Sequence, residues 1–332
     1  MISVHQLSKS FQQPVKNPGL RGAIQHLIKG KYQEKVVVDN ISMQIGPGES
    51  VAYIGKNGAG KSTTIKMLTG IMLPTSGTIK INGKDPFKQR NEVSKEMGAV
   101  FGQRTQLWWD IPIIESLNLM KDIYEIPNTI FKRNLDMFFD LLGISEFSHL
   151  TARKLSLGQR MRADLAMSLL HNPSIVYLDE PTIGLDITAK EQIRKIIKYI
   201  NKELGTTILL TTHDLDDIDN ICNRLILIDR GKIIFDGNLN DVKEKYVTDR
   251  VIHFTIDEPI PNLGEIVIEK IPGAFLENLN TNKFSIKFNR FHITAGDIVA
   301  IIMQYSKVLD IQIVEAKIED VIKKVYEGKL ML

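Results

Sequence analysis

Residues 55–62 read GKNGAGKS, and this stretch decides how the surrounding chain is expected to fold. It matches the pattern of a glycine-rich loop that binds phosphate groups at the start of a helix. The preceding residues 49–55, ESVAYIG, form a short apolar run, and residues 62–71, STTIKMLTGI, have the apolar spacing of a helix. The order strand, loop, helix is the context that the motif requires, so we expect an α/β fold with a phosphate site.

The residue types of this loop indicate what each position would do. Glycines allow the backbone N–H groups to close on a phosphate. Lys61 would reach the β and γ phosphates, and the Ser62 hydroxyl would bind Mg²⁺. The predicted nucleotide contacts of the loop are Gly55, Asn57, Gly58, Ala59, Gly60, Lys61, Ser62 and Thr63.

Further along the chain, strand and helix patterns alternate as a parallel sheet requires. Residues 174–182, SIVYLDEPT, and residues 206–214, TTILLTTHD, predict two more buried strands. Residues 224–237 predict a hairpin with its turn at Arg230 and Gly231, and residues 104–171 have mostly helical patterns, which we interpret as a helical insertion. Between the two buried strands, one helical face carries Ile193, Ile196, Ile197, Ile200 and Leu204.

Two acidic residues and a histidine follow the predicted buried strands. Asp179 ends an apolar strand, where a carboxylate is costly unless it helps to hold Mg²⁺. Glu180 lies at the carboxyl end of the strand, where open α/β sheets place their ligands, so it is the candidate to polarise an attacking water. His213 ends the next strand. A lone histidine there is more often a surface or core residue, but its place after the Glu180 strand favours a contact near the γ-phosphate.

Composition limits the classes of partner and compartment. The chain has 332 residues with 42 basic and 39 acidic side chains, a net charge of +3 that gives no reason to expect nucleic acid. Cys222 is the only cysteine, so an internal disulfide is impossible and a reducing compartment fits. The N-terminus lacks the pattern of a signal peptide, and no stretch approaches the roughly 20 apolar residues that span a bilayer. Transport would need a separate membrane subunit.

The pattern changes after Gly237. Strands are predicted at 250–257, 284–290 and 306–316, and helices at 295–305 and 318–326, so we expect residues 238–332 to form a small α+β domain. No motif in it indicates chemistry. A packing or dimer-stabilising role is favoured over ligand sensing.

Six motifs in order make residues 1–237 resemble the nucleotide-binding domain of an ABC transporter. They are the Walker A loop at 55–62, Gln103 of a Q-loop, the signature LSLGQ at 155–159, Walker B at 175–180, Asp186 of a D-loop and the switch histidine His213. The resemblance implies a P-loop NTPase fold with a helical subdomain at about 104–171, ATP and Mg²⁺ as ligands, and a catalytic and metal-binding role for Gln103. It also implies that Phe11 stacks on adenine, although Tyr32 is an alternative.

The signature explains why the polar stretch KLSLGQRMR at 154–162 runs into a helix. Ser156, Gly158 and Gln159 match the usual Leu-Ser-Gly-Gly-Gln, whereas Leu157 replaces its first glycine. The resemblance implies that this motif closes over the ATP of a facing domain. A serine hydroxyl and glycine N–H groups at a helix start agree with a second anion-binding surface.

The resemblance implies an ATPase that dimerises around two Mg-ATP, as a homodimer or heterodimer, and drives a separate multispanning permease from the cytoplasmic side of the membrane. The stretches around the motifs are most similar to ATPases of ABC-2-type exporters. Import stays open, as does a soluble ABC ATPase acting on ribosomes or DNA, while Glu180 and His213 argue against a non-catalytic module. For Trp108 and Trp109, permease contact and core packing are equally favoured.

An insert at 14–35 separates Phe11 from the strand that begins VVVDNISM. Its apolar residues Leu20, Ala23, Ile24, Leu27 and Ile28 follow helical spacing and are surrounded by lysine and arginine. Packing on its own domain is favoured, and docking on an anionic membrane or the permease is the alternative.

Overall fold

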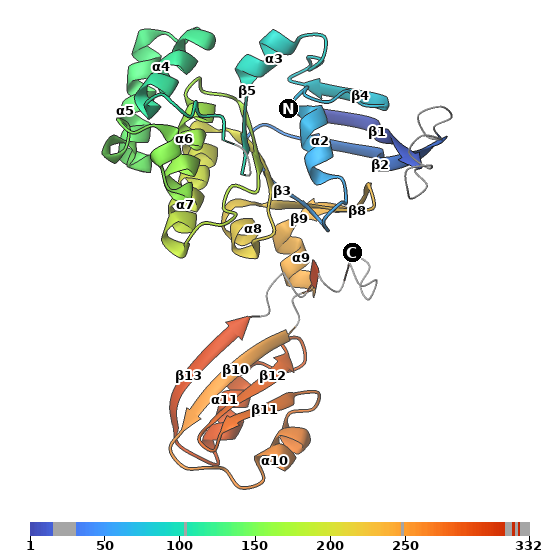
Figure 1. The fold of residues 1–332 in the computed structure, drawn as a ribbon. Coiled ribbons are helices and arrows are strands. Elements are labelled where there is room, and N and C mark those ends of the chain that lie inside the picture. Colours follow the sequence, from blue (N-terminus) through green and yellow to red (C-terminus); the bar gives the residue numbers. More distant parts are fainter. Residues whose placement is uncertain (16–30, 103–104, 247–248, 316–320, 323–324, 326–332) are drawn as a thin grey trace, which may run out of the picture. The chain divides into compact units, whose positions relative to one another are not determined.

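The computed structural model describes residues 1–15, 31–102, 105–246, 249–315, 321–322 and 325. The chain forms two compact units, Met1–Asn238 and Leu239–Leu332, which Figure 1 shows and which we describe separately. None of the described helices is both long enough and apolar enough to cross a membrane. The predicted helices at 20–28 and 318–326 fall wholly or mostly outside the described residues.

A six-stranded sheet forms the centre of the first unit and confirms the predicted α/β fold. Its order is β5-β6-β7-β3-β8-β9, and only the last pair is antiparallel. The side chains of β3 and β7 are buried throughout, because helices and a second sheet cover them. The strands are β3 (Ser50–Gly55), β5 (Met97–Phe101), β6 (Ile175–Asp179), β7 (Thr207–Thr211), β8 (Arg224–Asp229) and β9 (Lys232–Asn238).

Helices follow three of the parallel strands: α2 (Lys61–Leu68) follows β3, α7 (Ile187–Leu204) follows β6 and α8 (Leu215–Ile221) follows β7. A further helix, α3 (Arg90–Glu96), leads into β5. The predicted apolar face of α7 is buried except at Leu204, which is exposed. Leu204 is the last residue of α7, which ends at a C-cap glycine, Gly205, with φ 66°, and its side chain is left uncovered at this end of the helix.

The hairpin of β8 and β9 turns at the predicted residues. Arg230 has φ 46° and Gly231 has φ 81°, so both central residues are left-handed. This pair of conformations matches the right-handed twist of the two strands.

A second, antiparallel sheet packs its apolar side into the same core. Its order is β2-β1-β4, with β1 at Ile2–Val15, β2 at Lys31–Ile45 and β4 at Ser76–Ile81. Residues of both sheets, such as Ile45 and Tyr53, belong to one buried cluster. The strand pattern that begins at Val36 predicts most of β2, whereas β4 was not predicted.

The segment between β5 and β6 is helical, as predicted for the insertion. It contains α4 (Ile113–Ile123), α5 (Asn128–Leu142), α6 (Leu157–Leu169) and the short 3₁₀ helices η1 (Ile144–Glu146) and η2 (Ala152–Lys154). These helices form the green layer beside the central sheet in Figure 1. Residues 105–171, all of them described, contain no strand.

The second unit is an antiparallel four-stranded sheet with helices. Its order is β11-β12-β10-β13, and the Phe254 and Phe284 rings stack in its core with centroids 5.1 Å apart. The sequence patterns identified β10, β12, β13 and α11 but missed the others. The elements are α9 (Leu239–Tyr246), β10 (Asp249–Ile256), α10 (Leu263–Lys270), β11 (Phe275–Asn280), β12 (Lys283–Asn289), α11 (Ala295–Met303) and β13 (Val308–Glu315).

A buried carboxyl group ties α6 to the segment after β5. Asp164 Oδ1 accepts hydrogen bonds from Thr105 Oγ1 at 3.1 Å and from the Gln106 N–H at 2.9 Å. Burial raises the pKa of Asp164 to about 6, although these hydrogen bonds and Arg160 act in the opposite direction. The native state therefore binds this proton more tightly than the unfolded chain does.

This pKa predicts a pH-dependent stability difference between the wild type and Asp164→Asn. The native pKa lies above the unfolded one, so Asp164 adds stability as the pH falls through 6, and this gain is lost as the pH rises. From pH 7 to pH 5 the wild type should gain about 1 kcal/mol relative to the variant. Urea unfolding followed by tryptophan fluorescence measures this, because the only two tryptophans, Trp108 and Trp109, lie in the first unit. A difference that does not change with pH would contradict the prediction.

Candidate functional site

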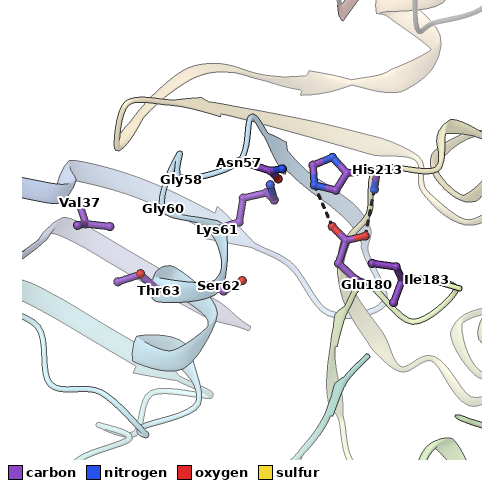
Figure 2. Close-up of a pocket in the computed structure, with 10 residues that line it drawn as sticks. All are labelled: Val37, Asn57, Gly58, Gly60, Lys61, Ser62, Thr63, Glu180, Ile183 and His213. Atoms are coloured by element: carbon purple, nitrogen blue, oxygen red, sulfur yellow. Dashed lines mark hydrogen bonds and ion pairs between the residues drawn. The ribbon is translucent and has the colours of Figure 1, made fainter. Parts of the chain in front are cut away.

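A pocket of about 340 Å³ lies at the carboxyl ends of the central strands. Figure 2 shows that the phosphate loop forms one side of it, while Glu180 and His213 form the other. The structure thus brings together residues that the sequence places more than a hundred positions apart. The pocket is lined by Val37, Asn57, Gly58, Gly60, Lys61, Ser62, Thr63, Glu180, Ile183 and His213. Val37 and Ile183 were not predicted.

The start of α2 is built to accept an anion. Its N-cap is Gly60, and no side chain among the described residues caps it, so the first-turn N–H groups are free of a side-chain acceptor. Lys61 Nζ folds back over the loop and donates to the Gly55 carbonyl at 2.6 Å. Burial lowers the pKa of Lys61, and the carboxylates of Glu180 and Asp179 partly oppose that shift. A partly desolvated ammonium beside free N–H groups fits a polyphosphate.

Glycine is required at position 60 for two reasons. Its φ is 109°, a conformation that strongly disfavours side chains. A Cβ atom would also lie 2.7 Å from the carbonyl oxygen of Val37 on β2. Gly58, with φ 81°, differs because no described atom lies within 4 Å of its Cβ position. The loop is therefore held against β2 at Gly60 and open at Gly58.

The end of β6 fits a Mg²⁺ site. Asp179 Oδ1 accepts a hydrogen bond from Thr211 Oγ1 of the neighbouring strand at 2.5 Å, and Ser62 Oγ lies 3.5 Å from the same oxygen. Within the described residues, no group of three or more acidic, histidine or cysteine side chains is arranged to hold a metal. Mg²⁺ commonly uses one or two protein ligands together with waters and substrate phosphates, so a hydroxyl and a carboxylate suffice.

The next residue turns sharply into the pocket. Glu180 has φ 57°, in the left-handed region, and its N–H donates to the Thr211 carbonyl at 3.0 Å. Its carboxylate accepts from the His213 N–H at 3.3 Å and lies 3.4 Å from His213 Nε2. Burial raises the pKa of Glu180, while His213 and Lys61 act to lower it. A carboxylate held here faces the space next to the phosphate loop, as Figure 2 shows.

A second pocket, of about 330 Å³, adjoins the first and shares Ser62 and Glu180 with it. Gly102 lines this pocket, and its N–H donates to the Asp179 carbonyl at 2.7 Å. A Cβ at position 102 would lie 2.1 Å from the Glu180 carbonyl oxygen, so only glycine fits. The predicted site residue Gln103 lies outside the described residues.

The predicted signature residues lie at the start of α6, and none of them is among the described residues that line the pocket. Ser156 is the N-cap of α6 and forms a capping box with Gln159, whose N–H donates to Ser156 Oγ at 3.2 Å. A Cβ at Gly158 would lie 3.4 Å from Ala189 of α7. The start of α6 thus packs on the start of α7.

Asp186 and Phe11 are also absent from the lining among the residues that the structure describes. Asp186 caps α7 and accepts the Ala189 N–H at 2.8 Å. Phe11 lies exposed on β1, with Lys9 Nζ 5.2 Å from its ring centre. The alternative, Tyr32, is exposed on β2.

The two adjacent tryptophans are surface residues. Trp108 is 38% exposed and Trp109 is 49% exposed, whereas the neighbouring Leu107 is buried. Arg160 of α6 lies over the Trp109 ring, 4.9 Å from its centre. The structure therefore disfavours core packing for the pair.

Comparisons with known proteins agree with this geometry. Residues 38–183 match the ABC transporter family. The methionine import ATP-binding protein MetN 2 of Enterococcus faecalis is 30% identical over 73% of this chain and 72% of its own length. The Nod factor export ATP-binding protein I of Cupriavidus metallidurans is 31% identical over 70% of this chain and 77% of its own. A dimeric ATP-binding cassette, MJ0796, solved with ADP and Pi, has a TM-score of 0.60 at 23% identity, covering 72% of this chain and 99% of its own, and so shares the fold.

The close approach of Gly60 to β2 predicts a severe effect of Gly60→Ala. The substitution should cost about 2–4 kcal/mol of folding free energy and abolish binding of a fluorescent ATP analogue. Gly205→Ala is the matched control, because Gly205 has φ 66° but no described atom lies within 4 Å of its Cβ position. It should cost about 1 kcal/mol and leave nucleotide binding unchanged. Equal effects of the two substitutions would refute the role of the Val37 contact.

Proposed function

The chain belongs to the ABC transporter family, and from this premise we propose that it is the ATP-hydrolysing subunit of a transporter whose membrane path lies in a separate polypeptide. The proposal rests on a single observation: Lys61 and Ser62 on one side of the pocket face Glu180 and His213 on the other. Phosphoryl transfer needs positioned groups and stabilised charge more than covalent chemistry. This pocket offers both.

Each group has a distinct part in the proposed reaction. Lys61 and the N–H groups at the start of α2 bind the phosphates of ATP. Ser62, Asp179 and Gln103 would hold Mg²⁺, which neutralises charge on the phosphates. Glu180 orients the attacking water and accepts its proton.

The remaining groups contact the nucleotide from other sides. His213 contacts the γ-phosphate, and its place beside the Glu180 carboxylate supports that role. Phe11 stacks on the adenine.

The second half of each site comes from another molecule in this proposal. Ser156, Gly158, Gln159 and Asp186 lie outside the pocket lining of their own chain among the described residues, although Ser156 and Gly158 begin a helix that suits an anion. Two copies, or one copy with a homologous partner, would each present these residues to the ATP of the other. Two Mg-ATP would then be enclosed per dimer.

Coupling to a membrane permease is proposed through the exposed Trp108–Trp109 pair. Tryptophan is frequent at the centres of protein interfaces. The pair lies beside the signature helix α6, because Arg160 of this helix lies over the Trp109 ring. Export is the proposed direction, supported by the export relative, whereas the methionine import relative represents the opposite direction.

Glu180→Gln should separate nucleotide binding from hydrolysis. The amide keeps the shape of the side chain but cannot accept the proton, so ATP turnover should fall by about 10²–10⁴-fold. ATP binding should persist, and a dimer that forms only with ATP should be visible by gel filtration. Near-normal hydrolysis by this variant would remove Glu180 from the mechanism.

Lys61→Ala is the control for this experiment, because it removes the charge-assisted contact to the phosphates. It should weaken nucleotide binding itself, and no ATP-dependent dimer should form.

Affinity purification of the tagged chain from detergent-extracted membranes should recover a multispanning protein. Replacing Trp108 and Trp109 with alanine should reduce that recovery while leaving basal ATPase activity intact. Ile268→Ala, at an exposed apolar side chain of α10, is the control and should not reduce it. Recovery of ribosomes or DNA instead would favour a soluble ABC ATPase.

The direction of transport can be tested by overproducing this chain together with its permease. Export predicts that a compound becomes more abundant in the medium than it does when the Glu180→Gln chain is overproduced with the same permease. Import predicts that the compound is depleted from the medium.

A further inference from the structure

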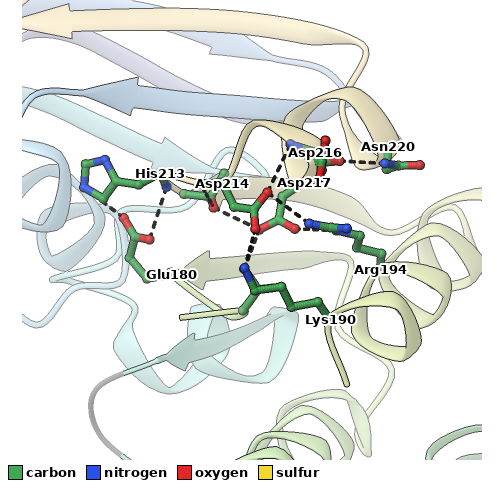
Figure 3. A network of polar contacts seen from close by, with 10 residues as sticks. Glu180, Lys190, Arg194, His213, Asp214, Asp216, Asp217 and Asn220 are labelled. Atoms are coloured by element: carbon green, nitrogen blue, oxygen red, sulfur yellow. Dashed lines mark hydrogen bonds and ion pairs between the residues drawn. The ribbon is translucent and has the colours of Figure 1, made fainter. Parts of the chain in front are cut away.

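A buried polar network lies directly behind Glu180 and His213, as Figure 3 shows. Its centre is Asp217 of α8, whose side chain is 0% exposed. One carboxylate oxygen accepts hydrogen bonds from Thr182 Oγ1 at 2.5 Å and Thr212 Oγ1 at 2.9 Å. The other accepts from Arg194 Nε of α7 at 2.6 Å. These three hydrogen bonds come from three different segments of the chain.

The two threonines connect Asp217 to the segments that carry the site. Thr182 follows Glu180 by two residues, and Thr212 immediately precedes His213. Both threonines are buried. One carboxylate oxygen therefore holds the Glu180 segment and the His213 segment at the same point.

A second carboxylate extends the network to the surface of α7. Asp214 accepts from Lys190 Nζ at 2.6 Å and from Arg194 Nη2 at 3.0 Å. Asp214 also caps α8, because its side chain accepts the N–H of Asp216 at 3.1 Å. Burial alone would raise the pKa of Asp214, but Lys190 and Arg194 hold that pKa below its ordinary value. The two carboxylates are matched by two cations.

The contacts within the site are weaker than those behind it. Glu180 and His213 approach each other at 3.3 and 3.4 Å, which is longer than a well-formed hydrogen bond. Glu180 also has a left-handed backbone, a conformation that persists only when surrounding structure enforces it. The short bonds to Asp217 supply that enforcement, because a buried carboxylate must keep its partners.

We propose that Asp217 is a positioning residue, which sets where His213 stands relative to the Glu180 carboxylate without touching the nucleotide. The inference rests on the proposed roles of Glu180 and His213. It assigns Thr182 and Thr212 as the two attachment points and Arg194 as the group that orients the carboxylate. Loss of either threonine's hydrogen bond to Asp217 would leave the phosphate loop unchanged. Turnover should therefore fall while the affinity for the nucleotide is retained.

The threonine at position 182 allows a test that spares the fold. Thr182→Val removes the hydroxyl at nearly constant volume, and Thr182→Ser keeps the hydroxyl. Small displacements of catalytic groups can lower rates by up to about 100-fold, so Thr182→Val should lower kcat roughly tenfold. Its affinity for a fluorescent ATP analogue should stay within about twofold, because the loop that binds phosphate is untouched. Thr182→Ser should restore most of the kcat.

Hydrogen exchange measured peptide by peptide separates a local effect from general destabilisation of the first unit. The His213 N–H donates to Glu180, so a peptide covering residues 211–216 should exchange faster in Thr182→Val, while peptides from β3, in the same unit, should not change. Asp217→Asn should show the same pattern with a larger loss of kcat. Ile218→Val is the matched control on α8, since Ile218 is buried beside Asp217 and forms no side-chain hydrogen bond. It should lower the melting temperature without lowering kcat.

The outcomes separate this inference from the proposed function. If Thr182→Val and Asp217→Asn keep normal kcat and normal exchange at 211–216 while Glu180→Gln loses turnover, Asp217 is not a positioning residue and the function stands. If Glu180→Gln itself keeps normal turnover, the proposed function fails first. A Thr182→Ser variant as slow as Thr182→Val would also overturn the inference, because the hydroxyl would then be irrelevant.

Discussion

Parallel pairing of β6 with β7 places Asp179 directly opposite Thr211, and the site depends on this register. The Thr211 hydroxyl fixes the Asp179 carboxylate, and the Thr211 carbonyl accepts the N–H of Glu180. A slip of one residue would turn every side chain of β6 to the opposite face. The carboxylates would then no longer face the phosphate loop. The side chains of β7 and the four apolar side chains of β6 are buried, so a slip would be costly and core packing secures the register that the chemistry requires.

The central strands other than β5, the helical insertion and the residues of the phosphate loop could be predicted, because each has a local pattern or a contiguous motif. Val37 and Asp217 could not. Val37 belongs to the other sheet and meets the loop only where the two sheets pack together. The proposed role of Asp217 depends on two threonines that come together in space. Periodicity placed Leu204 on the helical face of α7 but did not indicate its exposure, because spacing alone does not mark where a helix ends.

Two buried carboxyl groups connect the site to its surroundings by different means. Burial raises the pKa of Asp164, while its hydrogen bonds and Arg160 partly oppose that rise. Asp217 accepts three hydrogen bonds in total, one of them from the Arg194 guanidinium. The Asp164 carboxyl group thus attaches one segment to α6. The Asp217 carboxylate joins two segments and a cation of α7 at one buried point.

The contact between Leu157 and Gly184 has a consequence for which substitutions these two positions tolerate. Leu157 replaces the first glycine of the usual signature pattern, and a Cβ at position 184 would lie 3.0 Å from its Cδ2 atom. Gly184 also has φ 72°, so glycine is favoured there whatever occupies position 157. Glycine at position 184 is therefore fixed by its own left-handed backbone and not by the Leu157 contact, because the Cδ2 atom ends a flexible side chain that can turn aside. A change at position 157 would not free position 184 to take another residue.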